Sequence, residues 1–211
     1  MNRLAILGAS GHGKVVADAA ILAGWSAVDF YDDRWPAVSA LGPWPVVGDT
    51  AALLAAAERL EGAVVAIGAN KVRIAKQEAL VAAGVRVMTI AHPAATVSPH
   101  ASIGAGCVLF AGAVVNAFAT IGEASIINTG ATVDHDCILA EGVHLSPGAH
   151  LGGTVRIGRA SWIGIGAVVR HGIAIGAGVT VGAGAAVVDD IDDDLTVVGV
   201  PARPITSQRS T

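Results

Sequence analysis

Residues 121–151 read IGEASIINTGATVDHDCILAEGVHLSPGAHL, and every sixth residue of this stretch is aliphatic. The same period runs without a miss from Val97 to Val187. A second lane, four residues after each aliphatic position, holds small or apolar residues from Ala101 to Ala185. An α-helix needs apolar spacing near 3.6 residues and a simple strand alternates every two, so a period of six fits neither alone. It predicts a solenoid of short strands and sharp turns, with two inward positions in every six.

Glycine recurs at the fourth position of the hexads: Gly106, Gly112, Gly130, Gly142, Gly148, Gly166, Gly172, Gly178 and Gly184. A turn residue at positive φ costs glycine little and β-branched residues much. Three hexads form one triangular coil, so residues eighteen apart should stack about 4.8 Å apart. This hexapeptide pattern is typical of left-handed parallel β-helices, and most enzymes built on that fold transfer acyl groups from a thioester. The repeat therefore predicts about five coils and indicates acyl transfer from a thioester.

The chain has 211 residues and a net charge of −4, which allows one or two domains and gives no electrostatic footprint for nucleic acid or an anionic membrane. No stretch is apolar enough to predict a membrane span, and the first three residues lead directly into a strand rather than a signal peptide. Cys107 and Cys137 both fall in the small inward lane, where packing is the expected role. We expect a cytoplasmic protein without nucleic-acid binding or membrane insertion.

Residues 1–92 follow a different pattern, in which strands alternate with helices. Strands are predicted at 4–7, 27–31, 63–67 and 85–90, and helices at 14–23, after Asp49-Thr50 and from about 70 to 83. Such alternation predicts a small parallel sheet of Rossmann-like βαβ type. The fold class is therefore α/β plus all-β. We expect a nucleotide-binding domain at 1–92, a β-helix at 93–190 and a C-terminal tail at 191–211.

Between the first strand and the first helix lies the turn GASGHG, residues 8–13. Free backbone N–H groups at a helix amino terminus bind anions. The spacing is GxxGxG rather than the dinucleotide pattern GxGxxG, which favours the diphosphate of a nucleotide or nucleotide sugar over NAD. Asp32 or Asp33, ending the second strand, could accept hydrogen bonds from a ribose or a base. The alternative is that the glycines make a tight turn and the aspartates start a loop.

Histidine supplies a base of near-neutral pKa, which acyl transfer to an amine or hydroxyl requires. His135 is the best candidate because it occupies a predicted turn between Asp134 and Asp136, and a neighbouring carboxylate could fix its tautomer. The alternative for Asp136 is that it tolerates a left-handed turn. Gly153 follows His135 by eighteen residues, one coil away, where its N–H could serve as the oxyanion donor. His12, unusual within a glycine turn, favours a polar contact to substrate, with a surface histidine as the alternative.

His144 is nine residues from His135, or one and a half faces of the triangular coil. The two side chains therefore cannot easily meet within one subunit. If both serve one site, that site lies between neighbouring prisms. The spacing thus predicts an oligomer, most simply a threefold one, with clefts at the subunit boundaries.

Several motifs taken together resemble a known family: GASGHG at 8–13, Asp32-Asp33, GAN at 68–70, IAHP at 90–93, NTGATVDHD at 128–136 and GVPAR at 199–203. The chain resembles the sialic acid O-acetyltransferase type of sugar acyltransferases. Within it, the greatest similarity is to bacterial UDP-4-amino-sugar N-acetyltransferases that make UDP-N,N′-diacetylbacillosamine. The resemblance covers essentially the whole chain.

This resemblance implies a homotrimer with an amino-terminal nucleotide-sugar domain and a β-helix that binds acetyl-CoA between subunits, without a metal. It implies that His135 deprotonates the sugar C4 amine and that Asp136 orients it, where some relatives have Glu. It places His144 at the acetyl end of the cofactor and Gly153 as the oxyanion donor. The remaining implied cofactor contacts are Gly199, Val200, Pro201 and Arg203. The implied substrate contacts are Gly8, Ser10, Gly11, His12, Gly13, Asp32, Asp33 and Asn128.

Other functions remain open at this level. Within enzymes, they are O-acetylation of a sialic acid and N-acetylation of a GDP-linked amino sugar such as perosamine. A non-enzyme alternative is a hexapeptide scaffold that only binds a nucleotide or partner subunits. A γ-type carbonic anhydrase is disfavoured, because histidine pairs at suitable spacing are hard to find and the amino-terminal domain would be unexplained.

Overall fold

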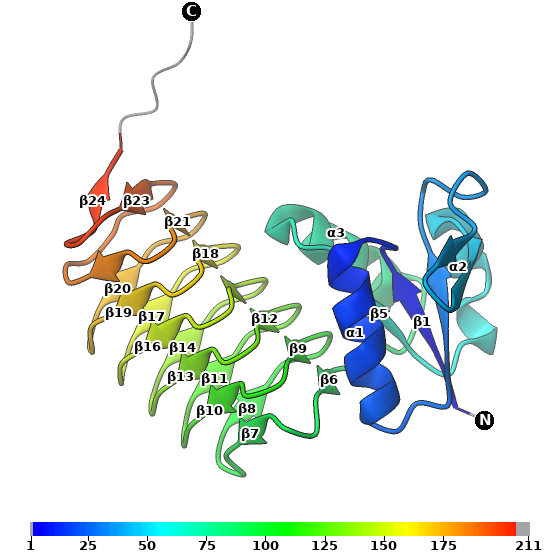
Figure 1. Cartoon of the computed structure of the whole chain (residues 1–211), viewed down its shortest axis with the longest axis horizontal. Coiled ribbons are helices and arrows are strands. Elements are labelled where there is room, and N and C mark those ends of the chain that lie inside the picture. The colour runs from blue at the N-terminus through cyan, green and yellow to red at the C-terminus, as the bar shows by residue number, and fades with distance from the viewer. Residues whose placement is uncertain (1, 206–211) are drawn as a thin grey trace, which may run out of the picture.

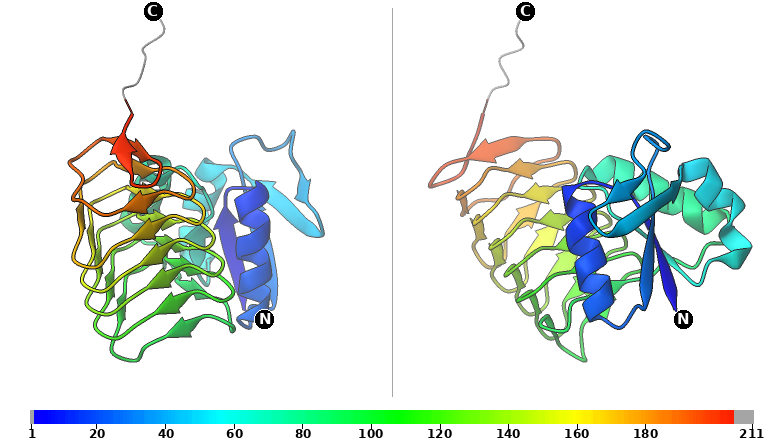
Figure 2. Two further views of the ribbon diagram at one scale, coloured as in Figure 1. Left: turned by 60° about the vertical axis from the view of Figure 1, so that its left-hand side comes forward. Right: turned by 45° about the vertical axis from the view of Figure 1, so that its right-hand side comes forward.

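The structure is a computed structural model that describes residues 2–205 (Figure 1). An amino-terminal α/β part is followed by a left-handed parallel β-helix, as the repeat predicted. Both parts lie against each other, with the α/β part beside the first coils (Figures 1 and 2). The expected tail residues 206–211 lie outside the described part of the chain.

A five-stranded sheet of order β3-β4-β2-β1-β5 forms the centre of the α/β part. Its strands are β1 (Arg3–Leu7), β2 (Ala27–Tyr31), β3 (Ala40–Leu41), β4 (Trp44–Gly48) and β5 (Ala63–Val65). The helices are α1 (Gly11–Leu22), α2 (Thr50–Ala55), the short 3₁₀ helix η1 (Ala57–Arg59) and α3 (Asn70–Ala82). All pairs are parallel except β3 with β4. Residues 4–7 of β1 are buried on both faces, as a central parallel strand requires.

The β-helix consists of two-residue strands joined by tight turns. They are β6 (Ile90–Ala91), β7 (Thr96–Val97), β8 (Ser102–Ile103), β9 (Val108–Leu109), β10 (Val114–Val115), β11 (Thr120–Ile121), β12 (Ile126–Ile127), β13 (Thr132–Val133), β14 (Ile138–Leu139), β15 (His144–Leu145), β16 (His150–Leu151), β17 (Arg156–Ile157), β18 (Trp162–Ile163), β19 (Val168–Val169), β20 (Ala174–Ile175), β21 (Thr180–Val181) and β22 (Ala186–Val187). The final coil adds β23 (Thr196–Val198) and β24 (Arg203–Pro204).

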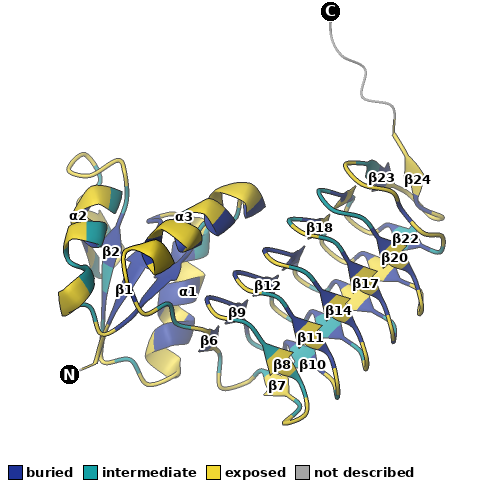
Figure 3. Cartoon of the chain, turned by 180° about the vertical axis from the view of Figure 1, so that it is seen from behind, coloured by how far each residue is buried: buried dark blue, intermediate teal, exposed yellow. Residues whose placement is uncertain are grey.

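These strands stack into three sheets that form the sides of the prism. We name them by their members: the β6 face (β24-β23-β21-β18-β15-β12-β9-β6), the β7 face (β22-β19-β16-β13-β10-β7) and the β8 face (β20-β17-β14-β11-β8). Partners in register are eighteen residues apart, such as Val115 and Val133. From Cys107 onward the predicted inward lanes form one buried core, with Cys107 and Cys137 fully inside as free thiols, whereas Val97 in the first coil is exposed. The outward residues are largely exposed (Figure 3).

The predicted turn glycines are confirmed, since all nine have positive φ. Where the same slot carries another residue, as at Phe118 and Asp136, the φ is also left-handed. The geometry of the coil therefore imposes this conformation, and glycine adopts it without a steric cost from Cβ.

Some predicted boundaries were wrong. Residues 85–90 do not form a fourth strand of the amino-terminal sheet: Val87 makes one bridge to Ala63, and β6 instead pairs with β9 of the β-helix. Helix α1 begins at Gly11, three residues before the predicted start, because the glycine turn already enters the first helical turn. The β3–β4 hairpin was not predicted. In the expected tail, β23 pairs with β21, so the sheet continues there.

A shared apolar core joins the two parts. Val16 and Ala20 of α1 pack with Val108, Phe110 and Ile126 of the β6 face. Small residues on the buried side of α1 allow close packing. On the side of its own sheet, α1 also packs closely, because an added Cβ at Gly13 would collide with the backbone oxygen of Gly8. This docking places the start of α1 directly against the β-helix.

Candidate active site

Asp32 holds the glycine turn at the end of β1 in place through hydrogen bonds. The backbone N–H of Ala9 donates to Asp32 Oδ2 at 2.8 Å, and Arg34 Nε donates to Asp32 Oδ1 at 2.8 Å. The hydrogen bond from Arg34 lowers the pKa of Asp32 to about 2. Asp32 is therefore a fixed carboxylate whose oxygens are already used to hold the turn.

Beside this turn lies a cavity of about 240 Å³, lined by Leu7, Gly8, Ser10, Asp32, Asp33, Ile67, Gly68 and Lys76. Lys76 Nζ donates to Asp33 Oδ2 at 2.9 Å, and this bond lowers the pKa of Asp33 to about 2. Ser10 is the N-cap of α1 and makes no side-chain capping bond. No atom lies within 4 Å of where a Cβ of Gly11 would be. The start of α1 therefore has open space beside Gly11, and helix amino termini favour anionic groups.

His12 points away from this cavity toward the β-helix. Its ring meets Phe110 edge-on, with centroids 5.6 Å apart, and lies 6.4 Å from the ring of His144 on β15. Asn128, in the turn after β12, lies 3.2 Å from Nε2 of His144 through its side-chain nitrogen. The structure therefore brings together His12, Asn128 and His144, which are far apart in the sequence.

Both imidazoles of this cluster are held neutral. Burial, and then the positive charge of Arg73, lowers the pKa of His12 to about 4 and that of His144 to about 3. Within the described residues, Nε2 of His12 and Nδ1 of His144 are buried without a hydrogen-bond partner. Because the Asn128 amide donates to Nε2 of His144, the proton of that ring is assigned to Nδ1. A buried N–H without an acceptor is costly, so it marks a position for an acceptor atom.

An apolar groove continues from His144 along the β6 face. Trp162 on β18 stacks on His144 with centroids 5.2 Å apart and planes 11° from parallel, and its Nε1 donates to Ser146 Oγ at 2.7 Å. The cavity has a volume of about 380 Å³ and is lined by His144, Ser146, Pro147, Trp162, Gly164, Ile165, Thr180, Val181, Gly182 and Ala183. The next strands of the sheet lead to the GVPAR turn, where Gly199 has a φ of 93° and Val200 is 76% exposed. In that turn, the cis Val200–Pro201 bond is followed by Arg203, which pairs with Asp189.

His135 and Asp136 form a separate pair in the turn between β13 and β14. Nδ1 of His135 lies 2.8 Å from Asp136 Oδ2, and the two side chains are 57% and 53% exposed. The left-handed φ of Asp136, 59°, brings its carboxylate back toward the preceding residue. The hydrogen bond to Asp136, and then the charge of Asp134, raises the pKa of His135. This hydrogen bond leaves Nε2 as the free position of an accessible base.

Gly153 lies one coil away and directly against the His135 ring. A Cβ at Gly153 would be 2.5 Å from Nε2 of His135, closer than any real contact allows. The backbone N–H of Thr154 donates to the His135 carbonyl at 2.9 Å and fixes the stacking. The ring position therefore depends on glycine at residue 153.

The structure does not bring His135 to His144 within one chain. Each coil passes through the β8 face, then the β6 face, then the β7 face. His135 sits at the corner between the β7 and β8 faces, which is the corner opposite the β6 face that carries His144. The predicted residues thus fall into three groups in one chain: the glycine-turn cavity, the His12–His144 cluster with its groove, and the His135–Asp136 pair.

Sequence reasoning missed Arg73, Lys76 and Trp162, and it named Asn70 only as part of a motif; a signal existed for Arg73 and Asn70. The buried residues of α3 are Asn70, Arg73, Ile74, Gln77 and Leu80, which is the spacing of a helix face turned to the protein interior. Three of these five are polar, and polar residues in such a stripe are the signal that could have identified them.

Among residues 2–205, no three His, Cys, Asp or Glu side chains are arranged to hold a metal ion. In the same range, no helix has both the length and the apolar character needed to cross a membrane.

Comparison with known proteins gives a consistent group of relatives. Residues 3–80 match the family described as the PglD N-terminal domain. The acetyltransferase domain of PglB from Neisseria gonorrhoeae FA1090, solved with acetyl coenzyme A, is 46% identical, with a TM-score of 0.93 over 97% of this chain and 100% of that chain. PerB from Caulobacter crescentus, solved with CoA and GDP-perosamine, is 38% identical, with a TM-score of 0.93 over 98% of both chains. WeeI from Acinetobacter baumannii AYE is 27% identical, with a TM-score of 0.87 over 97% of this chain and 100% of that chain. Among curated proteins, none matches closely enough to count as a relative.

Proposed function

This chain belongs to the hexapeptide-repeat sugar acyltransferases and is an acetyl-CoA-dependent sugar N-acetyltransferase, and we propose that it acetylates the C4 amine of a UDP-4-amino-4,6-dideoxy sugar. The product would be of the UDP-N,N′-diacetylbacillosamine type. Two similarities support this choice of acceptor: the PglD-type amino-terminal domain and the 46% identity to the PglB acetyltransferase domain.

The observation that carries the proposal is the exposed His135–Asp136 pair. Its accessible Nε2 suits a group that must take a proton from an incoming substrate, and Asp136 stabilises the resulting imidazolium. Acetyl-CoA supplies an acyl carbon already activated as a thioester. His135 accepts the amine proton as the N–C bond forms and returns it to the departing sulfur as the C–S bond breaks. The N–H of Gly153, beside the ring, is suited to the developing oxyanion.

The acceptor sugar fits between the glycine-turn cavity and the His12–His144 cluster. The nucleotide diphosphate would lie at the start of α1, where Gly11 leaves open space and Asp33 and Lys76 line the cavity. The next residue, His12, points toward the β-helix, so the sugar would extend along the same path toward Asn128. Because the cluster is neutral, it does not repel a substrate amine.

The groove along Trp162 fits the pantetheine arm of acetyl-CoA because it is long, apolar and open. His144 has an unpartnered buried Nδ1 at the end of this groove, which suits a hydrogen bond to the acetyl carbonyl. At the other end, Gly199, Val200, Pro201 and Arg203 would hold the rest of the cofactor.

We further infer that the active site is completed by a second copy of the chain. Within one chain, His135 lies at the prism corner opposite the face with the groove and the sugar path. A homotrimer would bring the His135 corner of one copy against the β6 face of the next and close three equivalent sites.

A GDP-linked 4-amino sugar is the second candidate acceptor, because PerB with bound GDP-perosamine is similar over 98% of the chain. The two acceptors share the amine chemistry and differ in the base that the amino-terminal cavity must recognise.

The test is thiol release from acetyl-CoA with UDP-4-amino-4,6-dideoxy-GlcNAc, a GDP-4-amino sugar and free or CMP-linked sialic acid, each with the wild type and with His135→Ala. The proposal predicts turnover with the UDP amine, reduced about 10²–10⁴-fold in His135→Ala. Turnover with the GDP amine alone would transfer the function to the second candidate. No turnover with any of these acceptors would overturn the proposed acceptor.

A further inference from the structure

Arg73 of α3 is the largest fully buried side chain of the described chain, at 1% exposure. Its guanidinium donates to the carbonyl oxygens of Ile67, Gly68, Ala124 and Gly142 and to Oδ1 of Asn70, at 2.7–3.0 Å. Among the described residues, no carboxylate pairs with it. A buried cation is usually paired with an acid, so a guanidinium satisfied only by neutral oxygens is unusual.

The acceptors of Arg73 belong to both parts of the molecule. Ile67 and Gly68 form the loop after β5 and line the proposed nucleotide cavity. Ala124 and Gly142 lie in two successive corner turns, just before β12 and β15. Asn128 follows β12, and His144 begins β15. The guanidinium of Arg73 therefore connects the proposed nucleotide loop with the two turns that precede the strands next to Asn128 and His144.

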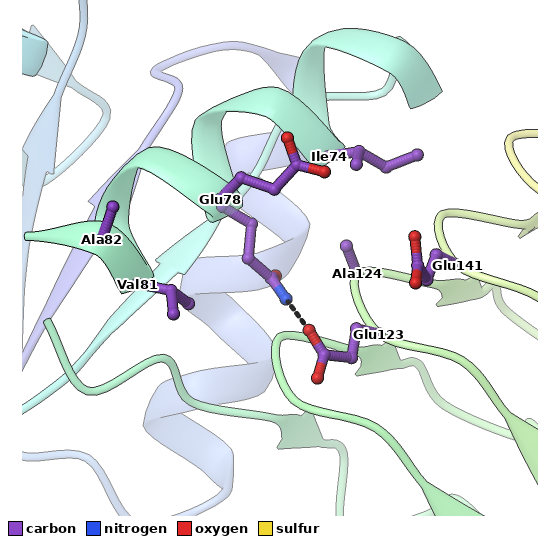
Figure 4. A pocket seen from close by; sticks show the side chains of 8 residues that line it. Ile74, Glu78, Val81, Ala82, Glu123, Ala124 and Glu141 are labelled. Atoms are coloured by element: carbon purple, nitrogen blue, oxygen red, sulfur yellow. Dashed lines mark hydrogen bonds between the residues drawn. The ribbon is translucent and has the colours of Figure 1, made fainter. Parts of the chain in front are cut away.

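Neighbouring contacts at this boundary are less able to fix the alignment. A cavity of about 300 Å³ lies between part of α3 and the corner turns, with Ile74 and Val81 on one side and Ala124 on the other (Figure 4). The packing of α1 on the β6 face is apolar and therefore not directional. Three buried side chains of α3 supply directed bonds across the boundary: Arg73, Asn70, whose amide donates to the carbonyls of Ala160 and Ser161, and Gln77, whose amide donates to the carbonyl of Ala105 at 3.0 Å. Among these three, Arg73 alone also donates to the carbonyls of the nucleotide loop, at Ile67 and Gly68.

We propose that Arg73 is a positioning residue that sets the distance and angle between the nucleotide cavity and the His12–Asn128–His144 cluster. The planar guanidinium holds five acceptors in fixed directions, which a lysine could not do. Since the nucleotide is bound on one side and the acyl group on the other, a small misalignment would carry the amine out of reach of the acyl carbon. This inference rests on the proposed function for its kinetic consequence, although the alignment itself does not.

The kinetic test compares Arg73→Met with Arg159→Met. Arg159 spans the same boundary through Glu78 at 3.0 Å and Glu141 at 2.9 Å, but it is half exposed, so its pairs should contribute little. We expect Arg73→Met to lower kcat with the nucleotide amino sugar about 10²-fold and to leave the Kd for the free nucleotide and for CoA within about threefold. The slow turnover of the same amino sugar without its nucleotide should not change, because a sugar that is not held in the nucleotide cavity does not depend on how that cavity is aligned with the His12–Asn128–His144 cluster. Equal loss with both acceptors, or no loss, would overturn the proposal.

A distance measurement tests the alignment without any turnover. Spin labels at Val72→Cys in α3 and Asp192→Cys in the last coil occupy exposed positions, and the native cysteines are buried. With one labelled chain per assembly, Arg73→Met should broaden the distance distribution and Arg159→Met should not. Where Arg73→Met does not fold, Arg73→Lys is used, because lysine keeps the positive charge but lacks the planar guanidinium with its five fixed donors. A distribution unchanged in the folded variant would contradict the proposal even if the enzyme proposal had failed, and a broadened one would support it.

Discussion

At the residue scale, the proposed base His135 is accessible, and its hydrogen bond to Asp136 orients it. The carboxylate accepts from Nδ1 at 2.8 Å and holds the pKa of His135 above its ordinary value of 6.5. An alkylammonium is not a nucleophile, so the C4 amine must be bound neutral or lose its proton to this base. Activity should therefore rise with pH as the imidazolium loses its proton.

Asp136→Asn is expected to move the acidic limb of the kcat–pH profile to lower pH, because the imidazolium loses its main stabilising hydrogen bond. The plateau should also fall, by about tenfold or more, since the tautomer is no longer fixed. Asp134→Asn is the matched control: Asp134 accepts from the backbone N–H of His135 and acts on the ring by charge alone, so its shift should be smaller and in the same direction. A wild-type profile that is flat from about pH 6 to 9 would count against His135 as the base.

Gly153→Ala should displace the His135 ring, because the new Cβ would lie 2.5 Å from Nε2. The ring is exposed and can swing outward at little cost, so the melting temperature should stay close to that of the wild type while kcat falls about 10–10²-fold. In a His135→Ala background the same substitution should have no further effect on kcat. An additive loss in the double variant would show that Gly153 acts independently of the ring.

At the element scale, the β-helix was predictable because a single local rule repeats. Each coil needs two inward residues and a left-handed turn residue in every six. The aliphatic inward position recurs sixteen times between Val97 and Val187, and the left-handed turn position recurs fourteen times between Gly106 and Gly184. The amino-terminal part was predicted less well at its junction. The apolar run at 85–90 suits a strand in either sheet, and only the docking of the two parts decides that Ile90 pairs with Val108.

The same limit applies to the site. Its separate turns could be located from motifs, whereas the His12–His144 cluster could not, because it depends on how α1 docks on the β6 face. The polar stripe of α3 could have marked Arg73 as buried, but its partners could not be predicted, because four of its five acceptors are backbone oxygens, which leave no residue pattern in the sequence.

The contact of α1 with the β6 face should make stability depend on pH. The pKa of His144 is about 3 in the folded chain and about 6.5 when unfolded, so the unfolded chain binds protons first as the pH falls. The stabilising effect is therefore complete above about pH 6.5, and about 3 kcal/mol of it is lost by pH 4.

Urea unfolding across this pH range measures the effect. His144→Asn should flatten the decline of the unfolding free energy between neutral pH and about pH 4.5. His171→Asn, in an exposed turn of the β-helix, is the control for replacing a surface imidazole by an amide. An unchanged slope in His144→Asn would contradict a buried neutral imidazole at this position.

At the scale of the whole molecule, the account requires two chains for each site. The proposed base His135 lies at one corner of the prism, and the proposed sugar path and the groove lie on the opposite face. The two halves can therefore be inactivated separately. His135→Ala removes the base. Gly11→Asp places a carboxylate at the proposed diphosphate position, where no neighbouring atom hinders it and the helix terminus tolerates it, and Gly11→Ala is its uncharged control.

The most direct measurement is acetyl transfer by a mixture of these two variants. His135→Ala and Gly11→Asp are unfolded, mixed in equal amounts and refolded together, with wild type treated in the same way. Each variant alone should be nearly inactive. The mixture should regain about a quarter of the wild-type activity, because in a randomly mixed cyclic assembly about a quarter of the sites combine an intact sugar half from one variant with an intact base half from the other. If the mixture shows no more acetyl transfer than either variant alone, while the refolded wild type is active, the result would contradict a site formed between chains.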